Sequence, residues 1–281
     1  MVRQGSSPTA GRPETSVARR TLALMQARHS AAAWPGLRAR VAAQAARLTA
    51  PDPAAAGRLC ALCWGPGQPG LEHCYRCDRY AQCLPGLLPD VVVPVAYAAK
   101  GGPHATNLWR YKSGHPGARA AQVELRALLL VFLRDHGPCV WRRAGAPGPG
   151  HVAVVPSRRG RPGGHPLRQL AAPYLRMTWA RLSLAGPDDP TAHDPDPGRF
   201  RAERLPGASV LLLDDTWTTG ASAISAAAAL RLAGARSVAL VVLGRHLDAG
   251  ALAAAGPRGC SPLAMPLRPW LCAVHAPGGS Q

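Results

Sequence analysis

The sequence predicts an α/β protein whose parallel sheet is covered by helices on both faces. Short apolar, β-branched runs at 91–97, 208–215 and 236–246 are typical of buried strands. They alternate along the chain with longer segments of helical periodicity, such as 118–137. This alternation favours a parallel sheet with helices on both sides. The chain has 281 residues, which is enough for one large domain with appendages or for two modest domains.

The N-terminal region differs in amino-acid composition from the rest of the chain. Residues 1–20 are polar, basic and contain Gly, Pro and Ser, so we expect disorder there. The alanine-rich stretch 31–50 has apolar residues at loose helical spacing and predicts a short helix. The sequence PDPAAAG then breaks the chain, and we assign residues 1–57 to a disordered or helical extension.

A four-cysteine pattern follows this extension. Cys60 and Cys63 form one C-x2-C pair, and Cys74 and Cys77 form a second. Each pair can present two thiolates to a tetrahedral ion, so the spacing predicts a closed, structural zinc site in a ribbon over residues 58–86. Disulfides or unpaired thiols are the alternatives, and a cytoplasmic chain disfavours disulfides. Because so small a unit has little core, the ion would supply its folding energy.

Other metal-binding residue types stand apart from this pattern. Cys83 is a further cysteine of the same segment that belongs to neither C-x2-C pair. The sequence CAVH places Cys272 three residues before His275, which makes a second and less favoured ligand pair. We therefore assign the zinc to the four-cysteine pattern.

From Asp90 onward the chain alternates between strands, loops and helices. Residues 91–97 form the first expected strand, and the loop-rich stretch 98–117 after it holds both lysines of the chain. A helix is expected over 118–137, with Gly137 at its end. The stretch 150–171 is interpreted as a strand, a basic loop and a helix.

The second half of the chain continues this alternation. Residues 183–207 are dense in Gly, Pro and Asp, which predicts an exposed loop. The run 208–215 is a strand, TWTTGAS is a loop, and 223–235 is a helix that ends near a glycine. A last strand is expected over 236–246, and the Pro/Gly-rich tail from Asp248 is expected to pack loosely.

The composition is strongly basic, with 33 Lys+Arg against 15 Asp+Glu and a net charge of +18. The arginines are spread along the chain, which favours a compositional bias over a nucleic-acid-binding surface and predicts only weak, non-specific binding to nucleic acid. Four residues depart from this bias, which indicates that their positions require a specific side chain: Lys100, Lys112 and the adjacent acids Asp214 and Asp215. No apolar run approaches the roughly 20 residues that span a bilayer, and the N-terminus lacks the apolar segment of a secretory signal. We therefore expect a cytoplasmic protein with no membrane partner.

The stretch SVLLLDDTWTTGAS carries the strongest functional signal. Its apolar run delivers Asp214 and Asp215 to the carboxyl edge of the sheet, where ligands bind in open α/β sheets. The loop after them opens a helix, and its backbone N–H groups, its hydroxyls and the helix dipole favour a phosphate. Carboxylates repel phosphate, so we expect them to bind a ribose diol. A βα turn with capping aspartates is the alternative.

This stretch resembles the phosphoribosyl pyrophosphate (PRPP) motif of type I phosphoribosyltransferases, in which four apolar residues precede two acids and a threonine- and glycine-containing loop. The resemblance implies that Asp214 and Asp215 bind the ribose hydroxyls, with Mg2+ held largely by PRPP oxygens and water. It also implies a cradle for the 5′-phosphate, formed by Thr216, Thr218, Thr219, Gly220, Ala221 and Ser222.

The order of motifs resembles that of ComF-type proteins, which are phosphoribosyltransferase-like and are linked in some bacteria to DNA uptake. The four-cysteine knuckle is followed by AYAAKGG, LWRYKSG, VVPSRRGR and the PRPP motif. The resemblance implies a type I phosphoribosyltransferase-like domain over 87–247, between the zinc ribbon and a tail over 248–281. The chain departs from the family where RRGRPGGHPLRQ stands in place of R-x-R-G-F-N-Q and where 177–207 is rich in Pro and Asp, so the acceptor is left open.

Charged residues near the motif fit an anionic ligand. Arg158 and Arg159 follow a strand end, as a pyrophosphate loop would, and we assign them to catalysis together with the two acids. An ordinary solvated basic loop is the alternative. Tyr111 and Lys112 could also reach the anion, although a structural role for the tyrosine fits equally well. Trp217 could stack on a substrate or, as we favour, cover the edge of the sheet.

Two functions from different classes follow from these observations. The first is an enzyme that transfers the phosphoribosyl group of PRPP to an unknown nitrogen acceptor through an oxocarbenium-like transition state and releases pyrophosphate. The second is a non-catalytic module that binds PRPP or a nucleotide and acts in DNA uptake or nucleic-acid processing. Release of pyrophosphate distinguishes them, and the sequence leaves the oligomeric state open.

Overall fold

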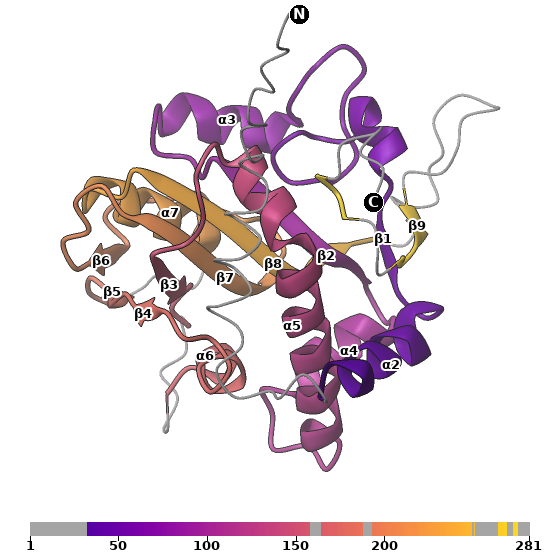
Figure 1. The fold of residues 1–281 in the computed structure, drawn as a ribbon. Coiled ribbons are helices and arrows are strands. Elements are labelled where there is room, and N and C mark those ends of the chain that lie inside the picture. The colour runs from indigo at the N-terminus through magenta and orange to yellow at the C-terminus, as the bar shows by residue number, and fades with distance from the viewer. Residues whose placement is uncertain are drawn as a thin grey trace, which may run out of the picture.

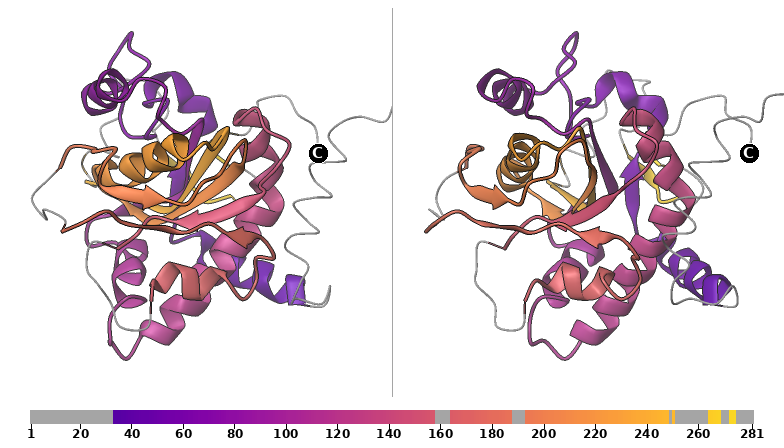
Figure 2. Two further views of the ribbon diagram at one scale, coloured as in Figure 1. Left: turned by 90° about the vertical axis from the view of Figure 1, so that its left-hand side faces the viewer. Right: turned by 60° about the vertical axis from the view of Figure 1, so that its left-hand side comes forward.

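The computed structural model describes residues 33–157, 164–187, 193–248, 250, 264–268 and 272–274. A seven-stranded sheet, in the order β4-β3-β7-β8-β2-β1-β9, forms its centre and carries helices on both faces (Figure 1, Figure 2). The predicted α/β class with a mostly parallel, helix-flanked sheet is therefore confirmed. The strands of this sheet are β1 (Thr49–Pro51), β2 (Val91–Ala99), β3 (His151–Val154), β4 (Thr178–Trp179), β7 (Ser209–Trp217), β8 (Ser237–Leu247) and β9 (Ala264–Pro266).

The sheet is parallel from β4 to β2 and antiparallel at its other edge. Each neighbouring pair among β4, β3, β7, β8 and β2 is parallel, whereas β1 runs antiparallel to β2 and to β9. Both faces of the parallel part are buried, as crossover helices require. Successive side chains of β7 enter opposite layers, with Leu211 and Leu213 on one face and Val210 and Leu212 on the other.

Two helical layers cover the two faces of the sheet (Figure 2). The apolar cluster on the face of Leu211 includes residues of α2 (Ala33–Ala45), α4 (Pro103–Arg110), α5 (Ala118–Arg143) and α6 (Pro166–Ala171). The cluster on the face of Leu212 includes residues of α3 (Tyr75–Cys83) and α7 (Ala221–Leu232). The cysteine-containing segment thus shares a core with the sheet.

Helix α5 is longer than expected. The sequence predicts an end at Gly137, but the helix continues through Gly137 and Pro138 to Arg143. A proline inside a helix costs about 3 kcal/mol because it removes one hydrogen bond and crowds the preceding turn. Val140 and Trp141 are 1% and 2% exposed in the core beyond it, and burial of two large apolar side chains offsets that cost.

Residues 183–207 are not all loop. The short strands β5 (Leu182–Leu184) and β6 (Phe200–Ala202) pair antiparallel as a separate two-stranded sheet. Phe200 is 3% exposed and belongs to the core cluster on the α7 face. The burial of Phe200 explains why a segment dense in turn residues holds two strands. Each strand has only three residues, which is too short to leave a periodic pattern in the sequence.

The two ends of the chain contribute to the sheet. β1 lies within the predicted N-terminal extension and pairs with β2 and β9. The 3-10 helix η1 (Pro53–Arg58) begins within this extension and ends one residue beyond it. Residues 264–268 and 272–274 of the tail pack against the core through Leu267 and Cys272, in contrast to the loose tail that the sequence predicts. The disorder expected for residues 1–20 falls outside the described residues. Within the described part of the chain, no helix combines the length and apolar character needed to cross a membrane.

Candidate functional site

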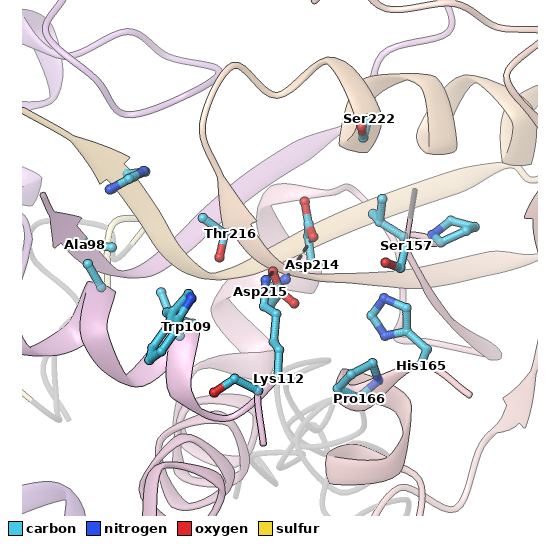
Figure 3. A pocket seen from close by; sticks show the side chains of 16 residues that line it. Ala98, Trp109, Lys112, Ser157, His165, Pro166, Asp214, Asp215, Thr216 and Ser222 are labelled. Atoms are coloured by element: carbon cyan, nitrogen blue, oxygen red, sulfur yellow. Dashed lines mark hydrogen bonds and ion pairs between the residues drawn. The ribbon is translucent and has the colours of Figure 1, made fainter. Parts of the chain in front are cut away.

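A cleft of about 580 Å³ opens at the carboxyl ends of the parallel strands (Figure 3). The ends of β2, β3, β7 and β8 contribute Ala98, Val155, Asp214 and His246 to its lining, and α4 forms one wall with Trp109. This is the edge where ligands bind in open α/β sheets. The sequence prediction that the two acids lie at a ligand-binding edge therefore agrees with the position of this cleft.

The acids reach the cleft because β7 extends beyond one of its neighbours. The sequence predicts that the strand ends at the acids, but β7 continues along β8 as far as the pair Trp217↔Arg245. On its other side, pairing with β3 ends at Val154↔Leu213. At Asp214 and Asp215, β7 therefore pairs with β8 but no longer with β3, and both acids line the cleft past the end of β3.

Asp215 is held by two residues from the end of α4. The Tyr111 hydroxyl donates to its Oδ2, and the Lys112 ammonium donates to its Oδ1 at 2.6 Å. Asp215 is 8% exposed and Tyr111 is 2% exposed. A buried carboxylate needs such partners, because an unpaired charge away from water is costly. Of the two roles that the sequence left open for Tyr111, the structural one is observed.

Asp214 occupies a different environment from its neighbour. In Figure 3 its carboxylate points toward the side of the cleft that holds Ser222, away from Lys112. Its carboxylate accepts hydrogen bonds from backbone N–H groups, that of Asp215 at 2.9 Å and that of Thr216. Burial, and then the nearby charge of Asp215, raise the pKa of Asp214 to about 7. The charge of Asp214 therefore changes around neutral pH.

The turn after β7 is shaped by Gly220 and Trp217. Gly220 caps α7 with a φ of 86°, a left-handed conformation that favours glycine. A Cβ at this position would lie 2.1 Å from Cζ2 of Trp217, whose side chain is 1% exposed. Trp217 therefore covers the inside of the turn and is part of the core, which agrees with the favoured alternative for this residue.

The residues predicted to form the phosphate cradle do not all line the cleft. Thr216 and Ser222 line the cleft (Figure 3). The Thr219 hydroxyl accepts a hydrogen bond from the N–H of Ala221 at 3.3 Å, so it caps the start of α7. The exposed Thr218 offers its carbonyl oxygen to Arg245. The segment predicted to bind the phosphate therefore forms a turn before the N-terminus of α7.

The predicted arginines Arg158 and Arg159 lie outside the described residues. The residue that precedes them, Ser157, lines the cleft near His165 (Figure 3). His165 caps α6, where its Nδ1 accepts from the N–H of Leu167 at 3.2 Å. The segment that follows β3 therefore borders the same cavity as the acids.

The four predicted zinc ligands gather at one place. The sulfur atoms of Cys60, Cys63, Cys74 and Cys77 all lie within 4.8 Å of one another. The Sγ atoms of Cys63 and Cys74 are 3.8 Å apart, which equals the edge of a tetrahedron with Zn–S bonds of about 2.3 Å. This arrangement is compatible with a structural zinc ion. Cys83 is exposed and stands outside the cluster.

The cysteine cluster contacts the loop after β7. Arg245 donates from Nε to the carbonyl oxygen of Cys63 at 3.0 Å and from Nη1 to that of Thr218 at 2.9 Å. The Tyr80 hydroxyl, from α3, donates to the carbonyl oxygen of Thr219 at 3.2 Å. The geometry of the loop therefore depends on the cysteine-containing segment.

No family model matches this chain, and a search of curated proteins finds no significant relative.

Sequence reasoning missed several residues of the site. Trp109 stands on the cleft wall with 62% of its surface exposed, and His246 lies at the end of β8. No local pattern distinguishes either residue. The rarity of lysine did mark Lys112, but its contact with Asp215 could not be inferred, since the two residues are 103 positions apart.

Proposed function

We propose that the cleft binds PRPP with Mg2+ and that the protein is a ComF-type phosphoribosyltransferase. The observation that carries this proposal is the conjunction of Asp214, at the carboxyl edge of β7, with the Gly220 turn and the N-terminus of α7. We infer that the sheet is of the type I phosphoribosyltransferase kind, that the four-cysteine segment is a zinc ribbon and that the protein acts in the cytoplasm.

The 5′-phosphate would bind at the start of α7. The N–H groups of a first helical turn have no partner within the helix, and the helix dipole adds positive potential there. The Ser222 side chain lines the cleft beside this turn and supplies a hydroxyl donor. Gly220 has no side chain, and the Trp217 ring fills the inner side of its turn, so an anion would approach the loop from the cleft.

The ribose would bind at Asp214. The partners of this carboxylate are the backbone N–H groups of Asp215 and Thr216, whereas Asp215 is held by the side chains of Tyr111 and Lys112. The remaining acceptor positions of Asp214 face the cleft and would take the two hydroxyls. Asp215 would orient Lys112 at the floor of the cleft. Carboxylate oxygens also suit Mg2+, which when bound would neutralise charge on the pyrophosphate that leaves.

The acceptor would bind against Trp109. Its indole is exposed on the cleft wall and contacts His115 edge-on, with ring centroids 5.7 Å apart. An exposed aromatic face in a cavity suits a planar heterocycle, because stacking adds about 1–3 kcal/mol. We therefore propose an aromatic ring nitrogen as the nucleophile. In the reaction the bond between C1′ and the pyrophosphate oxygen breaks, and a bond from C1′ to that nitrogen forms.

Calorimetric titration with PRPP and Mg2+ tests the binding step. Asp214→Asn should weaken PRPP binding roughly tenfold or more, since a hydrogen bond to a charged group contributes about 1.5–3 kcal/mol. The same variant should bind sulfate as well as the wild type does. Asp248→Asn, at an exposed acid outside the cleft lining, is the control. Equal PRPP affinity for the wild type and Asp214→Asn would contradict the ribose assignment.

A non-catalytic PRPP-binding module remains the second candidate function. The hydrogen bonds of Arg245 and Tyr80 favour it, because they connect the loop to a zinc-binding segment that a partner could contact. A pyrophosphate-release assay with a panel of aromatic nitrogen heterocycles separates the two. Pyrophosphate release by the wild type that is lost in Asp214→Asn supports the enzyme. PRPP binding with no pyrophosphate release in the presence of any acceptor tested supports the module.

A further inference from the structure

A second group of metal-binding side chains lies outside both the cleft and the four-cysteine cluster. The imidazole of His136 and the thiols of Cys139 and Cys272 each offer a ligand atom, and these three atoms all lie within 4.8 Å of one another. We propose that they form a second metal site, which binds Zn2+ and fastens the tail of the chain to α5. This site is independent of the function proposed for the cleft.

Helix geometry explains how α5 supplies two ligands. His136 and Cys139 are three residues apart, and residues at this spacing share one face of a helix. They share it here because α5 continues past Gly137 and Pro138. If the helix ended at Gly137, as the sequence predicts, Cys139 would leave this face. The packing that extends α5 therefore also assembles the pair.

The third ligand arrives from the tail. β9 pairs with β1, and the N–H of Leu267 donates to the carbonyl oxygen of Leu48 at 2.9 Å. A few residues later, Cys272 and Ala273 are each 4% exposed and belong to the apolar cluster that contains α5 residues. The tail thus returns to the core at the point where α5 presents His136 and Cys139.

The chemistry of the three donors selects the metal. Imidazole and thiolate are ligands of zinc, whereas Mg2+ and Ca2+ take oxygen donors. Zn–S bonds of about 2.3 Å place tetrahedral sulfur ligands roughly 3.8 Å apart, and the three donor atoms already lie within 4.8 Å of one another. His136 is 4% exposed, and its ring centroid lies 5.3 Å from that of Phe132. Such apolar surroundings strengthen a metal–thiolate site by excluding water.

The sequence around the three residues repeats the spacing of known zinc ligands. His136 and Cys139 form H-x2-C, and Cys272 begins the C-x2-H of CAVH. His275, which ends that motif, lies outside the described residues, and the proposal rests on the three described donors. Because the ligands come from two distant segments, the metal would stabilise the folded chain by joining them.

Metal analysis of the full-length protein tests the proposal. The protein is prepared without a polyhistidine tag and under reducing conditions, and its zinc content per chain is measured. Cys139→Ser and Cys272→Ser should each lower the zinc content by about one ion per chain relative to the wild type. Cys83→Ser, at an exposed thiol outside both clusters, should leave it unchanged. Equal zinc content in all four proteins would overturn the proposal.

A measurement on the wild type avoids dependence on the folding of the variants. When the protein is reconstituted with cadmium-113, a site with two sulfurs and an imidazole gives a resonance upfield of an all-sulfur site. The proposal requires a resonance in this mixed-donor range. Its absence, or a disulfide between Cys139 and Cys272 in the protein as isolated, would show that the cluster is not a metal site.

Discussion

The guanidinium of Arg245 donates a hydrogen bond to the carbonyl oxygen of Thr218 over 2.9 Å. Arg245 stands near the end of β8, and its Nε also donates to the carbonyl oxygen of Cys63. One side chain therefore connects the candidate phosphate loop with the candidate zinc ligands. A structural change in the loop or in the cysteine-containing segment should therefore displace the other through Arg245.

Replacement of Arg245 tests this connection. Arg245→Met should lower the free energy of unfolding by about 1.5–3 kcal/mol, because backbone carbonyls lose hydrogen bonds from a charged donor. It should also weaken the binding of PRPP and of sulfate together, since the loop itself is displaced. Urea unfolding and calorimetry measure the two effects. Arg236→Met, at an exposed arginine, is the matched control, and a loss of affinity as large in the control would refute the connection.

Removal of the predicted zinc ion should act on the same loop. Cys60→Ser breaks the four-sulfur cluster, so we expect a lower melting temperature and weaker PRPP binding than in the wild type. Cys83→Ser keeps the cluster and should match the wild type. Thermal unfolding and calorimetry on proteins of known zinc content are the measurements. An unchanged PRPP affinity in a zinc-free protein would show that the knuckle does not position the loop.

The raised pKa of Asp214 predicts a pH dependence of binding. Burial and the charge of Asp215 raise this pKa to about 7. Below that pH the carboxyl is protonated and is a poorer acceptor, so PRPP affinity should rise as the pH increases through about 7. Titrations from about pH 5.5 to about pH 8.5 measure the rise. In Asp214→Asn, the change of PRPP affinity with pH reports the titration of the ligand alone. If affinity changes with pH in the same way in the wild type and in this variant, Asp214 is not the titrating group.

The contacts of Asp215 predict energetic coupling between α4 and β7. Tyr111→Phe and Asp215→Asn should each destabilise the fold by about 1.5–3 kcal/mol, the contribution of a hydrogen bond to a charged group. The double variant should lose less stability than the sum of the two single losses, because both changes remove the same hydrogen bond between Tyr111 and Asp215. Urea unfolding of the four proteins completes the cycle. Strictly additive losses would mean that the hydrogen bond does not contribute to stability.

Gly220 is expected to tolerate no side chain. Gly220→Ala places a Cβ in a left-handed conformation and against the Trp217 ring, so we expect a loss of about 2–4 kcal/mol of stability. Gly207 also has a positive φ, of 68°, but nothing lies within 4 Å of an added Cβ. Gly207→Ala therefore measures the backbone strain alone. If both variants are destabilised equally, the contact with Trp217 carries no energy.

The sequence by itself determined the features that depend on neighbouring residues. The apolar run of β7, the glycine-containing turn and the helix after it follow from hydrophobic patterning and turn chemistry. The two C-x2-C pairs predict a cluster of four thiols because short spacings limit the geometry of each pair. These local signals were sufficient for the fold class and for the position of the two acids.

Tertiary structure decided how the site is completed. Tyr111 reaches Asp215 across 104 positions, and Arg245 reaches Cys63 across 182 positions. The proline inside α5 is accepted only because Val140 and Trp141 are buried beyond it. Strand order and core packing set these contacts, and neither leaves a periodic signal in the chain. The different surroundings of Asp214 and Asp215, and the gathering of His136, Cys139 and Cys272, exist only once the sheet and its helices have packed together.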